Sequence, residues 1–533
     1  MQKILQIEDT DNLIVALKDL KKGESFIIDN KEVVLTTDVK AKHKFTTEAI
    51  AVDGVVSLYG TAVGKATKPI AKGEAVTTEN LRHYAAPVSL ENETPYQWNK
   101  PDVTAHKNDH FLGYKREDGR IGTANYWLVF PLVFCQNRNV TKLTDTLNEV
   151  LGYSKQNTLK EFALELTNNK IPSTPKIKKP FPHIEGVRCI TVTSGCGGTA
   201  SDSLAMCDIL AAYADHPNVV GITVFILGCE KAQREFFQEA LDKRNPNFNK
   251  PTLYYRQQEW ESEESMMQAA LKETFNAMKK VPHTTRVNVP LSHLKIGVKC
   301  GGSDGFSGIS ANPAMGLVSD WVVALGGSSA LSEFPELCGA EGDIVHRCIT
   351  VQNKQKFLDL MKTYEKSANF FGTSISDNPS PGNIANGLIT DAIKSTGAAR
   401  KGGRSPVVEV CDYSEPMANQ GLSLVCTPGN DVEAVTGLVA AGCNVVIFST
   451  GLGTPTGNPI VPVIKIATNS EISNRLNDMI DFDCGEIIEG KPLPEVSKGL
   501  LKRVVETASG SYQVKADRLE QFDFIFWKRS VDL

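Results

Sequence analysis

The sequence of 533 residues predicts an α/β protein, in which a small, mostly β domain precedes two α/β regions with mostly parallel sheets. Three observations predict this class. Short strand-like runs broken by glycine and lysine turns fill the first 85 residues. A polar, proline-containing segment follows. From Gly113 onward, apolar runs, polar loops and helix-like patterns alternate, as they do where helices cover the faces of a parallel sheet.

The N-terminal β domain is predicted over residues 1–85. Its strand-like runs are Ser25–Ile28, Val33–Leu35 and Val55–Tyr59, and each is bounded by residue types that favour turns. Residues 86–110 are polar and contain prolines, so we expect a linker there. Helix-like patterns are therefore expected after this linker.

The first α/β region is predicted over residues 111–285. The runs YWLVFPLVF, CITVTS and ITVFIL are interpreted as buried strands, because short apolar stretches between turn residues are typical of parallel sheets. The second and third runs are followed, after polar loops, by the helix-like patterns LAMCDILAAYA and KAQREFFQEAL. Alternation of this kind predicts a Rossmann-like region whose strands end along one edge of the sheet.

The C-terminal α/β region is predicted over residues 286–533 and is also Rossmann-like. Its strand-like runs are HLKIGVK, ALGGSSALSE, VVEV, LSLVCTPG, NVVIFSTGLGT and VPVIKIATN. A helix is predicted after LVCTPGN, because Asp431 and Glu433 would lie near the positive end of its dipole. Two α/β regions are consistent with a chain too long for a single hydrophobic core.

The composition excludes several functional classes. The net charge is −5 and no long basic patch occurs, so nucleic acid is not an expected partner. No window approaches 18 uninterrupted apolar residues, and the N-terminus lacks the layout of a signal peptide. We therefore expect a cytoplasmic protein without membrane association, whose twelve cysteines are thiols or ligands rather than disulfides.

Four cysteines follow separate predicted strands, each among polar or glycine neighbours. They are Cys135, Cys196, Cys229 and Cys300. If these strands share one sheet edge, the four thiols would converge on one crevice, where thiolates select soft or borderline metals such as iron. The alternative is four unrelated small residues at strand ends, because no C-x-x-C pair is present. We predict the four cysteines as metal ligands.

The stretch VKCGGSDGFSGISANP, residues 298–313, separates a predicted strand from a predicted helix. Ligands bind at this position in open α/β sheets. Asp304 is therefore predicted to be catalytic, and Ser303, Ser307 and Asn312 to bind substrate. The alternative is a tight βα turn whose glycines serve only the backbone geometry.

An acidic cluster follows the next predicted strand, in LSEFPELCGAEGD. Crowded carboxylates bind a metal or act as acid and base, whereas the alternative is a solvated charged loop. Pro335 and Gly339 shape the turn directly after the strand, which favours a site. We predict Glu333 and Glu336 as metal ligands.

A third cluster is STGLGTPTGNPIVPVIKIATN. Its backbone amides could cradle an anionic group, so Thr454, Thr456 and Asn469 are predicted to bind substrate. Lys465 lies within an apolar strand, which is costly unless it meets an anion or takes part in chemistry, and it is predicted to be catalytic. No Walker loop is present, which argues against a nucleotide.

These motifs together resemble the altronate and galactarate dehydratase family. The matching segments are FLGYKREDGRIGTANYWLV, GCGG, LGCEKAQ, KCGGSDGFSGISANPAMG, EFPELCGAE, NPSPGN and STGLGTPTGNPIVPVIKIATN. The N-terminal segments resemble the SAF-type β-clip domain that precedes many members, so the resemblance covers nearly the whole chain. It is nearer to altronate dehydratases than to galactarate enzymes, although the loop around Phe134, Gln136 and Arg138 is bulkier and more polar than is familiar in the family.

The resemblance implies that the protein removes water from a six-carbon sugar acid, most closely D-altronate, giving 2-keto-3-deoxy-D-gluconate. It also implies a divalent metal (Fe²⁺ or Mn²⁺, with Mg²⁺ as a further option) and a homo-oligomer. Dehydration needs a base for the C2 proton and an acid for the leaving hydroxide. His43 is the candidate base or acid and Lys44 a carboxylate partner, if the first domain closes over the crevice as a lid.

Three alternatives stay open. The protein could act on galactarate or another hexarate, or it could be a different lyase or a hydrolase of small hydroxy acids on the same scaffold. It could also be a sensor that binds a sugar acid without reacting. The many thiols and carboxylates at strand ends favour an enzyme.

Overall fold

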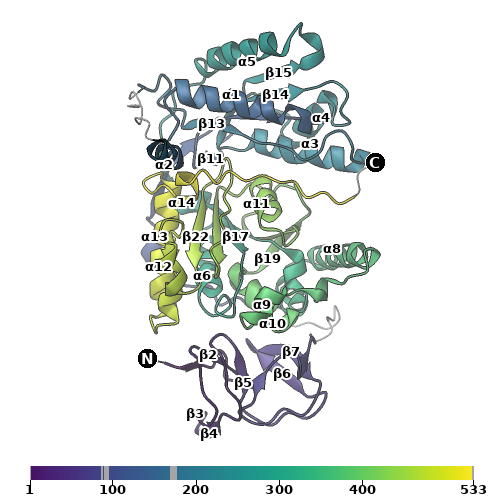
Figure 1. Ribbon diagram of the computed structural model, residues 1–533, viewed down its shortest axis with the longest axis vertical. Helices are drawn as coiled ribbons and strands as arrows, with labels where there is room; N and C mark the ends of the chain where they lie inside the picture. The colour runs from purple at the N-terminus through teal and green to yellow at the C-terminus, as the bar shows by residue number, and fades with distance from the viewer. Residues whose placement is uncertain (1, 86–87, 89–94, 156, 168–176, 531–533) are drawn as a thin grey trace. The chain divides into compact units, whose positions relative to one another are not determined.

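The computed structural model describes residues 2–85, 88, 95–155, 157–167 and 177–530, and Figure 1 shows it as a ribbon. Part of the predicted linker, residues 86–87 and 89–94, therefore lies outside the described residues. The chain divides into two compact units. The first comprises Met1–Phe111, Val289–Gly457 and Pro462–Leu519, and the second comprises Leu112–Asn288, Asn458–Val461 and Glu520–Leu533.

The N-terminal part of the first unit consists of short antiparallel strands, as predicted (Figure 1). They are β1 Ile4–Leu5, β2 Leu13–Ala16, β3 Ser25–Ile28, β4 Lys31–Val34, β5 Lys44–Thr46, β6 Val55–Leu58, β7 Thr61–Ala66, β8 Ala75–Val76 and β9 Leu81–Arg82. The sheets have the orders β1-β2-β5-β8, β3-β4 and β6-β7-β9. The β3–β4 hairpin turns at Asp29 and Asn30, both with positive φ, the backbone that two-residue hairpin turns of type I′ require.

The first unit also contains a seven-stranded parallel sheet, in the order β19-β20-β18-β17-β21-β22-β23. The strands are β17 Lys295–Cys300, β18 Ser328–Leu331, β19 Val407–Cys411, β20 Gly421–Val425, β21 Val445–Thr450, β22 Val463–Ala467 and β23 Phe482–Asp483. The chain starts in β17, proceeds to β18 on one side and later returns to β21 on the other. This reversal makes the carboxyl end of β17 the topological switch point, where open α/β sheets bind ligands.

Helices follow most of these strands. They are η4 Leu291–His293, α6 Ala311–Ala324, η5 Phe334–Leu337, α7 Glu341–Arg347, α8 Val351–Phe370, η6 Ile375–Asp377, α9 Pro381–Ala385, α10 Asp391–Ala399, η7 Arg400–Gly402, α11 Asp431–Ala440, α12 Ser470–Arg475, η8 Gly485–Ile487, α13 Leu493–Ala508 and α14 Lys515–Arg518. The predicted start of α11 is confirmed, with Asn430 as its N-cap. The central strand β17 is buried from Ile296 to Cys300, so its carboxyl end lies in the core of the unit.

The N-terminal strands share a hydrophobic core with the C-terminal helices of the first unit. Buried Leu58 and Val63 belong to one cluster with Phe306, Leu388 and Ile393. The β domain is therefore packed onto the C-terminal α/β region through apolar side chains, rather than joined to it only by the linker.

The second unit is built on a four-stranded parallel sheet in the order β13-β12-β14-β15. Its elements are β12 Tyr126–Pro131, η2 Phe134–Gln136, α1 Asn137–Val150, α2 Thr158–Leu166, β13 Gly186–Cys189, α3 Ala200–Asp215, β14 Val219–Ile226, α4 Arg234–Arg244, β15 Thr252–Arg256, η3 Gln257–Glu259 and α5 Glu263–Met278. The strands β10 His110–Lys115, β11 Ile121–Gly122 and β16 Val287–Pro290 form a small sheet in the order β11-β10-β16. The remaining element, η1 Thr104–His106, belongs to the first unit.

One predicted strand is displaced. CITVTS was expected to be a strand, whereas β13 ends at Cys189, where that run begins. Pairing with β12 fixes the register, with Tyr126 opposite Gly186. Ile190 and Val192 are buried all the same, so their apolar character reflects burial in the loop that leaves the sheet.

The described helices do not include one that is both long and apolar enough to cross a bilayer.

Candidate active site

Loops from three neighbouring strands meet at the switch point of the first unit. The loop after β17 is tied to β21, because the Gly301 amide donates to the Ser449 carbonyl over 2.9 Å and the Gly451 amide to the Gly302 carbonyl over 3.1 Å. The Cys300 amide donates to Glu333 Oε2, from the loop after β18, over 3.2 Å. Residues 298–313 therefore lie at the position expected of a ligand site.

Cys300, Glu333 and Glu336 come together at this point. Cys300 Sγ lies 3.4 Å from Glu336 Oε2 and 3.9 Å from Glu333 Oε2, and the three ligand atoms lie within 4.8 Å of one another in a buried environment. Glu333 has a φ of 69°, and its amide donates to Thr427 Oγ1 over 2.9 Å. A left-handed glutamate costs about 1–3 kcal/mol and is found mainly at functional sites.

Lysines neutralise the two carboxylates. Lys299 Nζ lies 2.5 Å from Glu333 Oε1 and 2.6 Å from Asp431 Oδ1, and Lys401 pairs with Glu333 Oε2 and lies 2.9 Å from Cys300 Sγ. Burial lowers the pKa of Lys299, but the charges of Glu333 and Asp431 outweigh it and hold that pKa above its usual value. The two lysines therefore remain charged.

The third lysine of the cluster is Lys394, whose Nζ lies 2.9 Å from Glu336 Oε1. With Glu333, Glu336 and Asp431 opposite Lys299, Lys394 and Lys401, three carboxylates face three ammonium groups. Burial raises the pKa of the Cys300 thiol to about 12, so Cys300 is neutral in this arrangement. The cluster is thus charge-balanced through its own residues.

The donor set of this cluster fits a borderline divalent metal. One thiol with two carboxylates combines a soft ligand, which suits iron, with hard ligands, which suit Mn²⁺ as well. Binding would release the thiol proton and would displace the Lys401 ammonium from Glu333. Cys300, Glu333 and Glu336 are therefore a possible metal site in which Lys401 competes with the ion.

A second cluster joins the β domain to the loop after β17. Lys42 Nζ lies 2.9 Å from Asp304 Oδ2 and 3.4 Å from Asn386 Oδ1. The other carboxylate oxygen of Asp304 accepts from the amide and hydroxyl of Ser307, both over 3.1 Å, and Asn469 Nδ2 lies 3.4 Å from Oδ2. Asp304 is completely buried, so this ion pair fixes residues 42–44 over the loop.

His43 and Lys44 follow Lys42 where the chain enters β5. Lys44 is completely buried, and its Nζ donates to the Gly387 carbonyl over 2.6 Å and to the Lys42 carbonyl over 3.0 Å. Burial lowers its pKa to about 7, against the opposing charge of Asp304. Burial also lowers the pKa of half-buried His43, whose Nε2 lies 3.3 Å from the Ala385 carbonyl. At neutral pH the imidazole is neutral and Lys44 is partly a free amine.

The segment Asn378–Gly387 contacts both clusters. Asn378 accepts from Lys394 Nζ over 2.9 Å, and Gly387 accepts from Lys44. Between them, Asn383 Nδ2 donates to the Ser303 carbonyl over 2.8 Å. One loop therefore links the carboxylate cluster to the lysines of the β domain. The sequence motif NPSPGN falls within it.

The predicted substrate-binding residues have different surroundings. Ser307 and Asn469 contact Asp304, and Thr454 Oγ1 lies 3.3 Å from Thr450 Oγ1. The amides of residues 452–454 all donate to Thr450 Oγ1, over 2.9 to 3.3 Å. The expected amide cradle for an anion was therefore wrong at these three residues, because their donors are already engaged.

Asn312, Thr456 and Lys465 are buried. The Asn312 side chain donates to the Gly397 carbonyl and accepts from Ser449 Oγ, each over 3.0 Å. Lys465 lies in β22, and its amide donates to Asp481 Oδ2 over 2.8 Å. Both ends of the Asn312 amide are thus engaged by protein, which indicates a structural role for it.

Replacing Asn312 by alanine is accordingly expected to lower the free energy of unfolding by about 1–3 kcal/mol, because two buried partners lose their hydrogen bonds, with little effect on the turnover of folded protein. Thermal unfolding and turnover per folded molecule check this. Unchanged stability with a strong loss of turnover would instead support a substrate-binding role for Asn312.

The other three predicted cysteine ligands lie in the second unit. Cys135, Cys196 and Cys229 follow β12, β13 and β14, whereas Cys300 ends β17 of another sheet. The condition of a single sheet edge is therefore met by three cysteines and is wrong for Cys300. All three are exposed, and within the described part of this unit no three His, Cys, Asp or Glu ligand atoms lie within 4.8 Å of one another.

Several residues of these clusters were missed by the sequence analysis. They are Lys42, Lys299, Lys394, Lys401, Asn383, Asn386 and Asp431. Lys299 alone carried a signal, because it lies inside a buried strand beside Cys300, as Lys465 does in its own strand. The other lysines occur in polar stretches that are typical of exposed loops.

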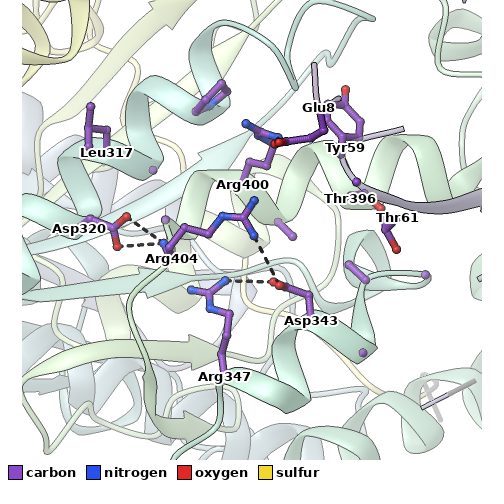
Figure 2. Close-up of a pocket in the computed structure, with 18 of the residues that line it drawn as sticks. Glu8, Tyr59, Thr61, Leu317, Asp320, Asp343, Arg347, Thr396, Arg400 and Arg404 are labelled. Atoms are coloured by element: carbon purple, nitrogen blue, oxygen red, sulfur yellow. Dashed lines mark hydrogen bonds and ion pairs between the residues drawn. The ribbon is translucent and has the colours of Figure 1, made fainter. Parts of the chain in front are cut away.

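The first unit also contains a cavity of about 610 Å³, and none of the residues that line it belongs to either cluster. Its lining includes Arg347, Arg400 and Arg404, which Figure 2 shows beside acidic residues. Asp343 lies 3.4 Å from Arg347 Nη1 and 3.6 Å from Arg404 Nη1, and Glu8 lies 3.6 Å from Arg400 Nη1. Because each guanidinium already faces a carboxylate, we place the chemistry at the buried clusters rather than in this cavity.

Comparison with known families matches the chain in three parts. A model described as "Altronate/galactarate dehydratase SAF domain" matches residues 2–84. One described as "D-galactarate dehydratase/Altronate hydrolase, second domain" matches residues 113–282, and one described as "D-galactarate/Altronate dehydratase, C-terminal" matches residues 291–532.

Individual relatives match over nearly the whole chain. The chain is 34% identical to an altronate dehydratase of Escherichia coli over 530 residues, 99% of each protein. It is 34% identical to an altronate dehydratase of Bacillus subtilis over 96% of each protein. A galactarate dehydratase (L-threo-forming) of Escherichia coli is 29% identical over 96% of this chain and 94% of that protein.

Proposed function

The chain belongs to the altronate and galactarate dehydratase family, and from this premise we propose that it is a metal-dependent hydro-lyase acting on a hexonate, D-altronate, to give 2-keto-3-deoxy-D-gluconate. The assignment as a sugar-acid dehydratase rests on the three matched parts and the named relatives. The choice of altronate is supported by 34% identity to altronate dehydratases against 29% to the galactarate dehydratase.

The observation that carries the proposal is the ion pair between Lys42 and Asp304. It holds His43 and Lys44 of the β domain against the loop that leaves the switch point four residues after Cys300. A site built this way combines bases from one domain with carboxylates and a thiol from another. Dehydration of a 2,3-dihydroxy acid needs a base for the C2 proton and stabilisation of the negative charge that develops beside the carboxylate.

Lys44 is suited to proton abstraction. A neutral lysine amine has two N–H bonds and one lone pair, and the two carbonyls that Lys44 contacts take both N–H bonds. Its lone pair is then left to accept the substrate C2 proton. A pKa of about 7 suits a base working near neutral pH. The Lys44 ammonium formed in this step can return the proton to the leaving hydroxide through half-buried, neutral His43 beside it, so that water departs and no net proton is taken up.

A divalent ion would be held by Cys300, Glu333 and Glu336. When bound, it would supply Lewis-acid stabilisation of the negative charge that develops beside the substrate carboxylate. Asp304 keeps Lys42 in place, and Lys42 is the partly exposed ammonium available to the substrate carboxylate.

Formation of a 2-keto-3-deoxy acid over a panel of hexonates and hexarates tests the substrate. We expect D-altronate to give the highest kcat/KM and galactarate a much lower one. A reversed order would make the protein a hexarate dehydratase. Binding of sugar acids without any product would make it a sensor, and release of sulfite or ammonia from other hydroxy acids would make it a different lyase.

Metal dependence has its own test. Chelation under anaerobic conditions is expected to abolish dehydration, and Fe²⁺ or Mn²⁺ to restore it, because the enediolate charge would otherwise lack a stabilising cation. Full activity of exhaustively demetallated protein would show that the reaction needs no metal. The lysine cluster would then be the only group that stabilises the enediolate charge.

A further inference from the structure

The three exposed cysteines of the second unit lie at one end of three adjacent strands. β13, β12 and β14 are neighbours in a parallel sheet, and Cys196, Cys135 and Cys229 follow them in that order. Neighbouring strands are about 4.8 Å apart, so the three exits span about 10 Å. Of the twelve cysteines, only these three are exposed.

Hydrogen bonds tie the three loops to one another beside the cysteines. The amide of Phe134, the residue before Cys135, donates to the Ser194 carbonyl over 2.9 Å. The Lys231 amide, two residues after Cys229, donates over 2.7 Å to the carbonyl of Gly195, the residue before Cys196. The cysteines therefore belong to one connected loop layer rather than to three independent turns.

Two of the cysteines follow a glycine that no other residue could replace without strain. Gly195 has a φ of 111°, and a Cβ there would lie 2.2 Å from the Leu132 carbonyl oxygen. Gly228 has a φ of 119°, and a Cβ there would meet Gln258 Oε1 at 2.4 Å. The same Gly-Cys arrangement thus follows two strands, and the Gly195 contact holds the loop of Cys196 against the exit of the central strand β12.

An unpartnered acid lies in the same layer. Glu230, next to Cys229, is 2% exposed. Its Oε2 accepts from the Gly228 amide over 2.7 Å, but its Oε1 has no hydrogen-bond partner. A buried carboxylate oxygen without a partner is costly, so this layer holds an oxygen that is still open to a metal or a donor group.

We propose that Cys135, Cys196 and Cys229 hold an iron–sulfur cluster, separate from the carboxylate site of the first unit. Thiolates are the ligands of such clusters. The three sulfurs do not lie within 4.8 Å of one another, as they would around a single tetrahedral ion, whereas a polynuclear core lies between its ligands and keeps them further apart. The proposal does not rest on the proposed function.

The test uses the full chain, purified anaerobically or reconstituted with ferrous iron and sulfide. We expect bound iron with acid-labile sulfide and the broad visible absorption of a cluster. Each single change, Cys135→Ser, Cys196→Ser or Cys229→Ser, is expected to lose most of the iron, the sulfide and the absorption. Cys189→Ser, which changes a thiol within β13 of the same sheet, and Cys300→Ser are the matched controls and should retain the sulfide.

Several results would overturn the proposal. The first is that the protein takes up no sulfide, and the second is that these cysteines bind iron or zinc without sulfide. The third is that the serine variants keep the wild-type content of iron and sulfide. Circular dichroism and thermal unfolding of each variant show whether a loss of cluster arises from unfolding instead. Because sulfide content and absorption are measured without turnover, failure here leaves the proposed dehydratase activity untouched.

Discussion

Lys44→Met is expected to lower kcat by about 10²- to 10⁴-fold, the usual contribution of a general base. The same change is expected to remove a pH dependence of stability. Because burial lowers the pKa of Lys44 from 10.5 to about 7, the unfolded chain binds one proton more than the folded chain between these values. Wild-type stability should therefore rise with pH in this window, by up to about 1.4 kcal/mol for each pH unit.

Unfolding midpoints of the wild type and Lys44→Met at pH 7.5 and 9.5 measure this slope, and steady-state kinetics measure the turnover. Lys299→Met is the matched control, because Lys299 is equally buried but its charge is balanced by Glu333. Its loss should destabilise the protein by about 3–5 kcal/mol. Wild-type turnover of Lys44→Met would make Lys44 a structural residue and leave His43 as the only base of the β domain.

The second large effect is expected for Glu333→Gln. Glu333 neutralises both Lys299 and Lys401 in a fully buried position, so its removal leaves Lys299 paired with Asp431 alone and Lys401 with only the more distant Glu336. Breaking a buried pair in this way costs about 3–5 kcal/mol. Because Glu333 is also a candidate ligand, bound divalent metal should be lost together with turnover. Thermal unfolding and metal analysis of anaerobically prepared protein check both.

Asp343→Asn is the control for this change, since Asp343 comes from the same acidic stretch but is half-exposed in its pair with Arg347. Buried Arg347 also donates to the Ser405 carbonyl, and its partner Asp343 is solvated, so the loss is expected to stay near about 1 kcal/mol. If Glu333→Gln kept the wild-type stability, the lysine cluster would not depend on Glu333 for its charge balance. If it also kept metal and turnover, the site would lie elsewhere.

The packing of the β domain changes one expectation drawn from the sequence. If that domain were only a lid over the crevice, a chain beginning near residue 105 would fold and lose only catalysis. Phe306, Leu388 and Ile393 share a core with Leu58 and Val63 of the β domain, so removal of the first 105 residues would expose apolar side chains. We now expect this truncated chain to aggregate, whereas His43→Ala should stay folded and lose turnover.

The fold class was predictable because its signals are local. The run before Cys300 alternates and ends in a polar, glycine-rich loop, and β17 ends there. The displaced strand after Gly186 shows the limit of such signals. Ile190 and Val192 are apolar because the loop is buried, and only the pairing of β13 with β12 decides where the strand ends.

The candidate site was predictable where polar residues end or follow a strand, as Cys300, Asp304 and Glu333 do. The lysines of the site were not predictable, because the residues they contact are distant in sequence. Lys401 pairs with Glu333 from 68 positions away, and Lys44 contacts Gly387 from 343 positions away. A lysine in a run such as AKHKF is normally exposed, so its burial depends on tertiary packing alone.

The central claim is that the substrate is bound where residues 42–44 of the β domain face the loop after β17. Amide hydrogen exchange of the full chain, with and without saturating D-altronate in metal-free protein, tests it most directly. We predict slower exchange at residues 42–46, 300–307 and 383–388, because the loops would be ordered by the bound sugar acid. Protection confined to residues 134–136, 194–199 and 228–232 would place the substrate at the cysteine loops of the second unit and contradict the account.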